Sequence, residues 1–325
     1  MHDMYESLPD IDAKWRQFAT RKAISAIRNC KHPIKSIKDM QNIRGVGAKT
    51  QKKILDFLKT KKITLLENLK NDPQLRTIME FKGIYGVGSQ TAKEWWNRGL
   101  RTLDDVRSRK DGVNLNENQE LGLRYYDDIN ARMPREEAKE IFEQVKAEAL
   151  ELDPKLLIEA MGSYRRGKKD CGDLDILISR PTNDGRDHEG LLDDLLMVLH
   201  QKKIILHDLA LPKPTDRLES KYMGLAASTD PNHKVRRLDI LTIPCHQWGA
   251  ALLYFTGDDI FNRSMRLLAR KQGYSLNQRG LFAGVVRNSK GIKLNNGTII
   301  CSATEREIFD KLGVPWQEPH ERKRG

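Results

Sequence analysis

Three aspartates in the second half of the chain have a spacing that suits a metal site. Asp173 and Asp175 stand two residues apart in GDLDILIS, a run that predicts a β-strand, so both side chains should face the same side. Asp239 interrupts VRRLDILTIP, a second predicted strand, where an uncompensated carboxylate would be destabilising. Mg²⁺ prefers carboxylate oxygens and substrate phosphates, and two such ions can activate an attacking oxygen and stabilise a leaving one. The spacing therefore predicts a divalent-metal site, while the alternative is that DxD, a frequent pattern, lies on an exposed strand face.

A predicted anion site adjoins the aspartates in sequence. Residues 162–169 read GSYRRGKK, which is a Gly-Ser turn followed by a run of cations. Backbone N–H groups, the serine hydroxyl and arginine in such a turn can hold a triphosphate. A site for cations beside a site for phosphates predicts nucleotidyl transfer.

One internal repeat stands out in the first third of the chain. IRGVGAKT at residues 43–50 and IYGVGSQT at residues 84–91 both fit IxGVGxxT and lie forty-one residues apart. Each copy stands between helical patterns, so its glycines allow a tight turn at a helix N-terminus, where a phosphate can dock. A single copy could simply end a helix, but two matched copies in a basic region predict helix-hairpin-helix motifs that grip a sugar-phosphate backbone.

The charge of the chain fits a polyanionic partner. Its 57 Lys and Arg against 45 Asp and Glu give a net charge of +12, and residues 1–70 alone hold 16 basic and 7 acidic residues. Such an excess suits nucleic acid or an acidic membrane surface. No apolar run approaches the roughly 20 residues that a membrane span needs, and the start MHDMYESLPD is no signal peptide. We therefore expect a soluble protein that binds nucleic acid, and no membrane partner.

The four cysteines contain no CxxC pair and are far apart, which disfavours a zinc cluster or a disulfide framework and suits a reducing, intracellular compartment. The abrupt start and the basic tail HERKRG are compatible with a core excised from a longer protein.

The hydrophobic pattern predicts an α+β chain of several sub-domains. Up to about residue 150 the apolar spacing is helical, and no sheet is expected there. Four β-rich runs follow, KLLIEAMG, DLDILIS, KYMGLAA and VRRLDILTIP, with a helix over EGLLDDLLMVLHQKK between the second and third. After Pro244 one helical stretch runs through WGAALLYFTGDDIFNRSMRLLARKQG, before short strands and a final helix near ATEREIFDKLG.

From about Trp15 to WQEP at residues 316–319, the chain resembles the family X DNA polymerases, and their lambda and fungal polymerase IV branch more closely than polymerase beta. The matching motifs are GSYRRGKKDCGDLDILI, RRLDI, ALLYFTG with FNRSMR, ARMPREE and GVGSQTAKEWW. The resemblance implies a helix-hairpin-helix, lyase-like domain of the 8 kDa type over residues 1–75 and a fingers-like helical domain over 76–135. A polymerase beta-like nucleotidyltransferase palm over 136–245 and a thumb-like, nucleotide-selecting sub-domain over 246–325 would follow.

The resemblance also implies roles for individual residues. Asp173, Asp175 and Asp239 would hold two Mg²⁺ ions, for which Mn²⁺ can substitute, and a monovalent cation would sit at the hairpin loops. The nucleotide contacts would be Arg132, Ser163, Arg166, Gly172, Tyr254, Phe255 and Asn262. The DNA contacts would be Trp15, Arg16, Gly45, Gly47, Lys49, Gly86, Gly88, Arg263 and Arg266. From the residues alone, Tyr254 and Phe255 could equally be core, Arg132 could cap a helix, and Arg263 and Arg266 could form a solvated basic face.

A second activity follows from the same resemblance. Lys53 matches the family lysine that forms a Schiff base with an abasic 5′-deoxyribose phosphate. Without the family, it would be one of many DNA-contacting lysines. The sequence departs from the family pattern at Thr20, where relatives often have Tyr, and at Asp258, where they usually have Ser.

The function predicted is template-directed filling of short gaps in DNA repair, during base excision or end joining, in the nucleus and by a monomer. The substrates would be gapped or nicked DNA with a 5′ phosphate, and deoxynucleoside triphosphates. Two alternatives remain: a template-independent terminal transferase, disfavoured by the short stretch at residues 210–220, and a non-catalytic DNA-end-binding module, for which three intact aspartates are not expected.

Overall fold

The computed structural model describes residues 4, 13–28, 30, 32–213, 217–228, 233–289 and 291–322 of the 325-residue chain. These residues form two compact units, which divide between Tyr126 and Asp127. Each unit has its own hydrophobic core, as expected for a chain of this length.

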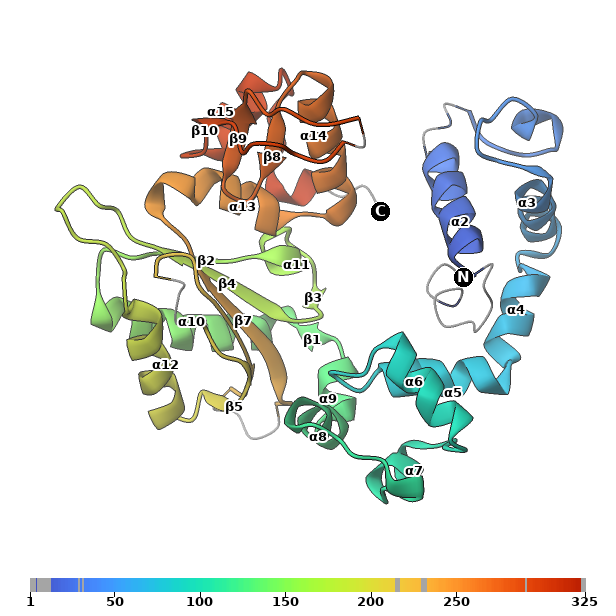
Figure 1. Ribbon diagram of the computed structural model, residues 1–325, viewed down its shortest axis with the longest axis horizontal. Coiled ribbons are helices and arrows are strands. Elements are labelled where there is room, and N and C mark those ends of the chain that lie inside the picture. The colour runs from blue at the N-terminus through green and yellow to red at the C-terminus, as the bar shows by residue number, and fades with distance from the viewer. Residues whose placement is uncertain are drawn as a thin grey trace. The chain divides into compact units, whose positions relative to one another are not determined.

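The described part of the first unit is helical, as the apolar spacing predicted (Figure 1). Its core packs Phe81 against Trp95, whose ring centroids lie 5.6 Å apart. Side chains at the N-termini set where several helices begin, among them Asp72, Thr102 and Asn116. The helices are α2 (Ala13–Arg28), η1 (Lys38–Met40), α3 (Ala48–Thr60), α4 (Thr64–Asn71), α5 (Pro73–Lys82), α6 (Ser89–Asn97), α7 (Leu103–Arg107), η2 (Lys110–Gly112) and α8 (Glu117–Arg124).

The second unit is built on a five-stranded mixed sheet. The strand order is β2-β4-β7-β6-β5, in which β4 and β7 are parallel and the other pairs are antiparallel. Helices α10 and α12 pack against each other and against one face of the sheet in a single core. The elements, in chain order, are α9 (Tyr126–Asn130), β1 (Met133–Pro134), α10 (Arg135–Leu152), β2 (Leu157–Ala160), α11 (Gly162–Arg165), β3 (Asp170–Cys171), β4 (Leu174–Ser179), α12 (Leu191–Gln201), β5 (Ile205–Ala210), β6 (Lys221–Ala226) and β7 (Arg236–Thr242).

Three strands differ from the sequence prediction: β5, β1 and its partner β3. The run at β5 was not predicted, because this edge strand alternates weakly and has His207 and Asp208 at its centre. The expectation of no sheet before residue 150 was wrong at β1, which pairs with β3 through Met133 and Cys171. A two-residue strand has no periodicity of its own, so only its distant partner defines it.

The C-terminal part of this unit packs the three helices α13, α14 and α15 with a small antiparallel sheet of order β10-β9-β8 (Figure 1). The single helical stretch predicted after Pro244 is in fact two helices, which break at Gly257 because its backbone is left-handed, with φ of +70°. Asp258 caps the start of the second helix, since its side chain accepts a 2.8 Å hydrogen bond from the backbone amide of Phe261. The elements are η3 (Cys245–Gln247), α13 (Trp248–Thr256), α14 (Asp259–Lys271), β8 (Ser275–Asn277), β9 (Gly280–Ala283), β10 (Thr298–Cys301), α15 (Glu305–Lys311) and η4 (Pro319–Glu321).

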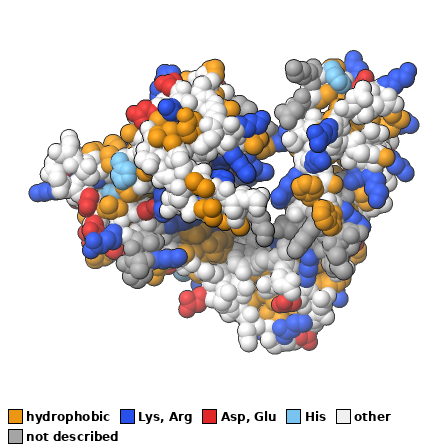
Figure 2. Space-filling model, turned by 45° about the horizontal axis from the view of Figure 1, so that its top comes forward, with side chains coloured by type: hydrophobic (Ala, Val, Ile, Leu, Met, Phe, Trp, Pro, Cys, Tyr) orange, Lys and Arg blue, Asp and Glu red, His pale blue; other side chains and the backbone are white. Residues whose placement is uncertain are grey.

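The α+β class predicted from the sequence is confirmed, with a helical region first and a mixed sheet after it. On the face shown in Figure 2, the blue Lys and Arg side chains are more widespread than the red acidic ones, as the net charge requires.

Candidate active site

The three predicted aspartates lie at neighbouring positions on one face of the sheet. Asp175 on β4 pairs in register with Asp239 on β7, and Asp173 immediately precedes β4. Leu174 and Ile176, the neighbours of Asp175, point into the core under α10 and α12. Because side chains alternate along a strand, Asp175 and Asp239 face away from those helices. The parallel pairing thus brings together carboxylates that are 64 residues apart in sequence.

Burial and mutual repulsion perturb these carboxylates. Desolvation, followed by the charges of Asp173 and Asp239, raises the pKa of Asp175 to about 7. Two cations oppose this effect. The guanidinium of Arg237 lies 3.1 Å from Asp173 Oδ2 and 3.6 Å from Asp239 Oδ1, and Lys221 Nζ lies 3.0 Å from Asp239 Oδ2. The site is therefore an acidic cluster that needs positive charge.

The donor set fits a hard divalent cation. Among the described residues, Oδ1 of Asp239 is buried and accepts no hydrogen bond, so it retains capacity for a further cationic partner. Within the same residues, no group of three or more His, Cys, Asp or Glu side chains is already arranged around a metal position. The side chains of Lys221 and Arg237 contact the carboxylate oxygens instead. Three carboxylates on one face supply the oxygen ligands that Mg²⁺ and Mn²⁺ prefer.

The Gly-Ser turn lies directly against the acidic cluster. The backbone amide of Met161 donates to the carbonyl of Asp175 at 2.8 Å. Gly162 follows with φ of +57°, and a Cβ there would lie 2.9 Å from Asp175 Oδ2. Only glycine fits this position, because the backbone is left-handed and the carboxylate is close. The half-buried Ser163 comes next, so the predicted phosphate site and the acidic cluster are neighbours in space as well as in sequence.

The cations that follow the turn reach across to helix α13. Arg166 donates through Nη1 to the carbonyl oxygen of Thr256 at 2.5 Å, at the end of that helix. Arg165, which the sequence did not single out, donates to both carboxylate oxygens of Glu305 at 2.8 and 3.1 Å. The turn is therefore tied to the C-terminal module by two arginines.

Two further predicted nucleotide contacts lie beside each other. Arg132 donates to the side chain of Asp170 at 2.8 Å and to its backbone oxygen at 3.0 Å. A Cβ at Gly172 would lie 3.0 Å from Nη1 of Arg132, so the glycine leaves room for the guanidinium. The pairing of β1 with β3 produces this contact, which no local pattern indicates.

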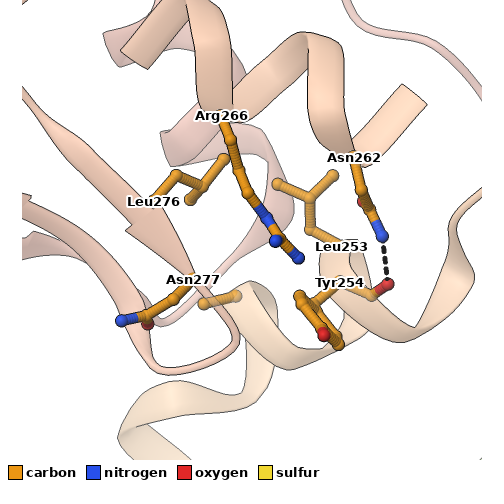
Figure 3. Close-up of a pocket in the computed structure, with 7 residues that line it drawn as sticks. Leu253, Tyr254, Asn262, Arg266, Leu276 and Asn277 are labelled. Carbon is orange, nitrogen blue, oxygen red and sulfur yellow. Dashed lines mark hydrogen bonds between the residues drawn. The ribbon is translucent and has the colours of Figure 1, made fainter. Parts of the chain in front are cut away.

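A small pocket between α13, α14 and β8 collects part of the predicted nucleotide and template contacts (Figure 3). Arg266 points from α14 toward the ring of Tyr254, with its Cζ 4.8 Å from the ring centroid. Asn262 donates to the backbone oxygen of Tyr254 at 2.6 Å. The remaining lining residues, none of which was predicted as a site residue, are Ala250, Leu253, Leu276 and Asn277.

Phe255 and Arg263 do not line this pocket. Phe255 packs edge to face on Tyr254, with centroids 4.9 Å apart, and contributes to a core with Trp248. Arg263 is exposed and pairs with Asp259 one turn earlier on α14.

The two copies of the repeat have the same backbone geometry. Gly45 and Gly86 are left-handed, with φ of +107° and +82°. Gly47 and Gly88 are extended residues that directly precede α3 and α6. A Cβ at Gly47 or Gly88 would meet nothing within 4 Å, so the packing of the chain itself does not require glycine there. Both turns therefore leave the start of a helix open to close approach by a ligand.

The residues predicted for the second activity all lie in the first unit. Lys49 and Lys53 are one turn apart on α3, with Lys49 exposed and Lys53 half buried. Trp15 is 72% exposed on α2, next to the exposed Arg16. The Thr20 hydroxyl donates a 2.7 Å hydrogen bond to the backbone oxygen of Arg16, so its hydrogen bond is made within the helix.

Sequence profiles for four domains match the chain in order. They are described as a helix-hairpin-helix domain at residues 5–63, a fingers domain of DNA polymerase lambda at 79–130, a DNA polymerase beta palm at 132–245 and a DNA polymerase beta thumb at 251–323.

Curated relatives agree with these profiles. DNA polymerase lambda of Rattus norvegicus is 39% identical over 309 residues, which cover 95% of this chain and 52% of the relative. DNA polymerase lambda of Arabidopsis thaliana is 36% identical over 313 residues, with coverages of 94% and 58%. DNA nucleotidylexotransferase of Xenopus laevis is 27% identical over 338 residues, with coverages of 95% and 64%. The chain thus spans about half to two thirds of the length of these relatives. None of its described helices is long and apolar enough to cross a membrane.

Proposed function

Because the chain belongs to the family X DNA polymerases, we propose that it is a template-directed DNA polymerase that fills short gaps during DNA repair, in base excision or end joining. The observation that carries the proposal is the contact between the Gly-Ser turn and the acidic cluster. A Cβ at Gly162 would lie 2.9 Å from Asp175 Oδ2, which itself is in register with Asp239. A nucleotidyl transfer needs this arrangement, since the triphosphate and the metal-binding carboxylates must share one site.

Each aspartate would have a defined role in the reaction. Asp173 and Asp175 would hold both divalent ions, and Asp239 would hold the catalytic one. Mg²⁺, or Mn²⁺ in its place, supplies the positive charge that stabilises the attacking and leaving oxygens. Asp239 would also take the proton from the primer 3′ oxygen, directly or through water, before in-line attack on the α-phosphate releases pyrophosphate.

Other side chains bind and orient the incoming deoxynucleoside triphosphate. Its phosphates would contact Ser163 and Arg166 after the turn, and Arg132 beside Gly172. Tyr254 and Phe255 would pack beneath the sugar, where their bulk disfavours a ribose 2′ hydroxyl. On α14, the template and the new base pair would contact Asn262, Arg263 and Arg266.

Each of the four domains would also have its own role. We assign residues 1–75 to DNA-end binding, 76–135 to the fingers-like region, 136–245 to the palm and 246–325 to the thumb-like region. The open turns at Gly47 and Gly88 support backbone contacts to gapped or nicked DNA with a 5′ phosphate, and a monovalent cation at these turns is part of the proposal. Action on chromosomal gaps implies a nuclear protein, which we expect to work as a monomer.

Primer extension across a one-nucleotide gap with a 5′ phosphate tests the proposal. The protein should insert the nucleotide that the template base specifies, in the presence of Mg²⁺ or Mn²⁺, and Asp239→Ala should abolish insertion. Glu189→Ala, which removes an exposed carboxylate paired with Arg217, should insert normally. Tight binding to the gap without insertion by the intact protein would contradict the proposal and favour an end-binding module.

Untemplated synthesis is the competing reaction. The relative named as a nucleotidylexotransferase is 27% identical, against 39% and 36% for the lambda polymerases. Only residues 211–220 connect β5 to β6, which leaves little chain to take the place of a template. Addition of nucleotides to a single-stranded primer at the rate seen on the gap would overturn the templated reaction.

A second candidate activity is removal of a 5′-deoxyribose phosphate by Lys53. Its position on α3, one turn beyond Lys49 and after the open turn at Gly47, supports the assignment. Borohydride trapping on a 5′-incised abasic duplex should cross-link the protein and fail with Lys53→Ala. Lys59→Ala is the matched control on the same helix, and equal trapping by the Lys53 variant would sink the assignment.

A further inference from the structure

Lys221 contacts the acidic cluster from a strand that carries none of the aspartates. It lies on β6, where Met223 pairs with Asp239 and Lys221 with Leu241 on β7. Lys221 and Asp239 are therefore diagonal neighbours on the same face of the sheet. The Lys221 ammonium lies 3.0 Å from Asp239 Oδ2, although Asp239 is almost completely buried.

Arg237 differs from Lys221 in how firmly it is held. It stands two residues before Asp239 on β7, and its guanidinium lies within 3.6 Å of both Asp173 and Asp239. Its side chain is three-quarters buried, whereas that of Lys221 is 50% exposed and its described ion pair is with a single carboxylate. A flexible, half-exposed lysine gives up one ion pair more readily than a bridging arginine gives up two.

We infer that Lys221 is an internal counter-ion that a divalent cation displaces from Asp239, so that this lysine sets the affinity of the site for metal. The inference rests on the proposed function, because it assumes that the aspartates bind metal. A bound Mg²⁺ would lie about 2.0–2.1 Å from a carboxylate oxygen of Asp239, and an ammonium at hydrogen-bond distance from the same carboxylate would repel it strongly. One cation therefore replaces the other. Before metal arrives, Lys221 offsets the charge of a carboxylate that would otherwise be buried without enough compensation.

The test is Mn²⁺ binding to the DNA-free protein, measured from the electron paramagnetic resonance signal of free Mn²⁺. Lys221→Met should bind Mn²⁺ about tenfold more tightly than the wild type, since it removes the competing charge. Lys202→Met is the matched control: Lys202 is 51% exposed and lies 2.6 Å from the mostly buried Glu148, remote in sequence from the aspartates. It should leave the Mn²⁺ affinity unchanged. Lys221→Gln, a milder change, should shift the affinity in the same direction as Lys221→Met.

Two outcomes separate the inference from the proposed function. If Asp239→Asn binds Mn²⁺ as well as the wild type, the metal site itself is wrong. If Asp239→Asn loses binding but both Lys221 variants match Lys202→Met, the metal site stands and the counter-ion role is refuted. Thermal melting gives a second readout. Without Mn²⁺, Lys221→Met should have a lower melting temperature than the wild type, and adding Mn²⁺ should raise that temperature more than it does for the wild type. If the melting temperature of Lys221→Met were lower than that of the wild type by the same amount at every Mn²⁺ concentration, the lysine would be purely structural, which would also refute the inference.

Discussion

Breaking the buried ion pair between Arg236 and Glu137 should be among the most destabilising single changes in the second unit. Arg236 begins β7, and its Nε and Nη2 donate to the two carboxylate oxygens of Glu137 at 2.6 and 2.8 Å. Its Nη1 donates to the carbonyl oxygens of Asp128 and Ala131 at 3.1 and 3.0 Å. The pair thus ties the strand that carries Asp239 to the first turn of α10 and to the chain that leads into β1.

The magnitude follows from burial. The two side chains are only 5% and 4% exposed, so Glu137→Ala leaves a guanidinium without its charged partner and with little access to water. Breaking such a pair costs about 3–5 kcal/mol. The exposed pair between Arg217 and Glu189 gives the contrast, because losing it through Glu189→Ala should cost less than about 1 kcal/mol.

Urea unfolding measured by circular dichroism provides the assay. Glu137→Ala should lower the midpoint of the transition of the second unit without changing its slope, and far more than Glu189→Ala does. The double variant Glu137→Leu with Arg236→Met should lose less than the sum of the single losses, because it leaves no unpaired charge behind. Equal midpoint shifts for Glu137→Ala and Glu189→Ala would refute the reasoning from burial.

Three further changes test local features of the second unit. Gly249→Ala should destabilise by about 1–3 kcal/mol, because its Cβ would lie 2.2 Å from the backbone of Thr304, and an unchanged melting temperature would contradict that packing. Asp258→Ala should destabilise by about 1 kcal/mol because it removes the cap of α14, whereas Asp258→Ser should retain most of the stability that the cap provides. Equal melting temperatures for the two variants would refute the cap. The guanidinium of Arg180, with help from a neighbouring lysine, holds the pKa of Asp184 well below its usual range, so the pair stabilises the fold above the unfolded pKa of about 3.9 and loses this effect on acidification. Urea midpoints of Asp184→Asn should therefore fall below those of the wild type at pH 7 and converge with them toward pH 2, and a constant difference would contradict the assignment.

The sequence predicted the parts of the fold that are set by local periodicity. The long amphipathic helices α2 and α10 and the strands β4, β6 and β7 have clear spacing, and all of them are present. The edge strand β5 was missed because only one side of it has a strand neighbour and its centre is polar. The break between α13 and α14 was missed because the apolar pattern continues across it. The Gly-Asp pair at residues 257–258 was the sequence signal for this break, because Gly257 has a positive φ and Asp258 caps the next helix.

The sequence predicted those site residues whose side-chain type and local spacing already indicate their chemistry. The pairing of Asp175 with Asp239 follows from parallel strands, which the sequence gives no direct way to align. Lys221 and Arg237 were not singled out, although Arg237 precedes Asp239 by two residues and must share its face of β7. Lys221 has no such signal, because its approach to Asp239 depends on the register between β6 and β7.

Arg166 links two subsites that the sequence treats as separate. It follows the Gly-Ser turn beside the acidic cluster, yet its guanidinium donates to the carbonyl oxygen of Thr256, the residue directly after Phe255. A phosphate oxygen is a stronger acceptor for a guanidinium than a neutral carbonyl is, because both partners are then charged. A triphosphate on the turn would therefore compete with α13 for Arg166. In the structure, this one side chain joins the cationic turn to the end of the helix that carries Tyr254 and Phe255.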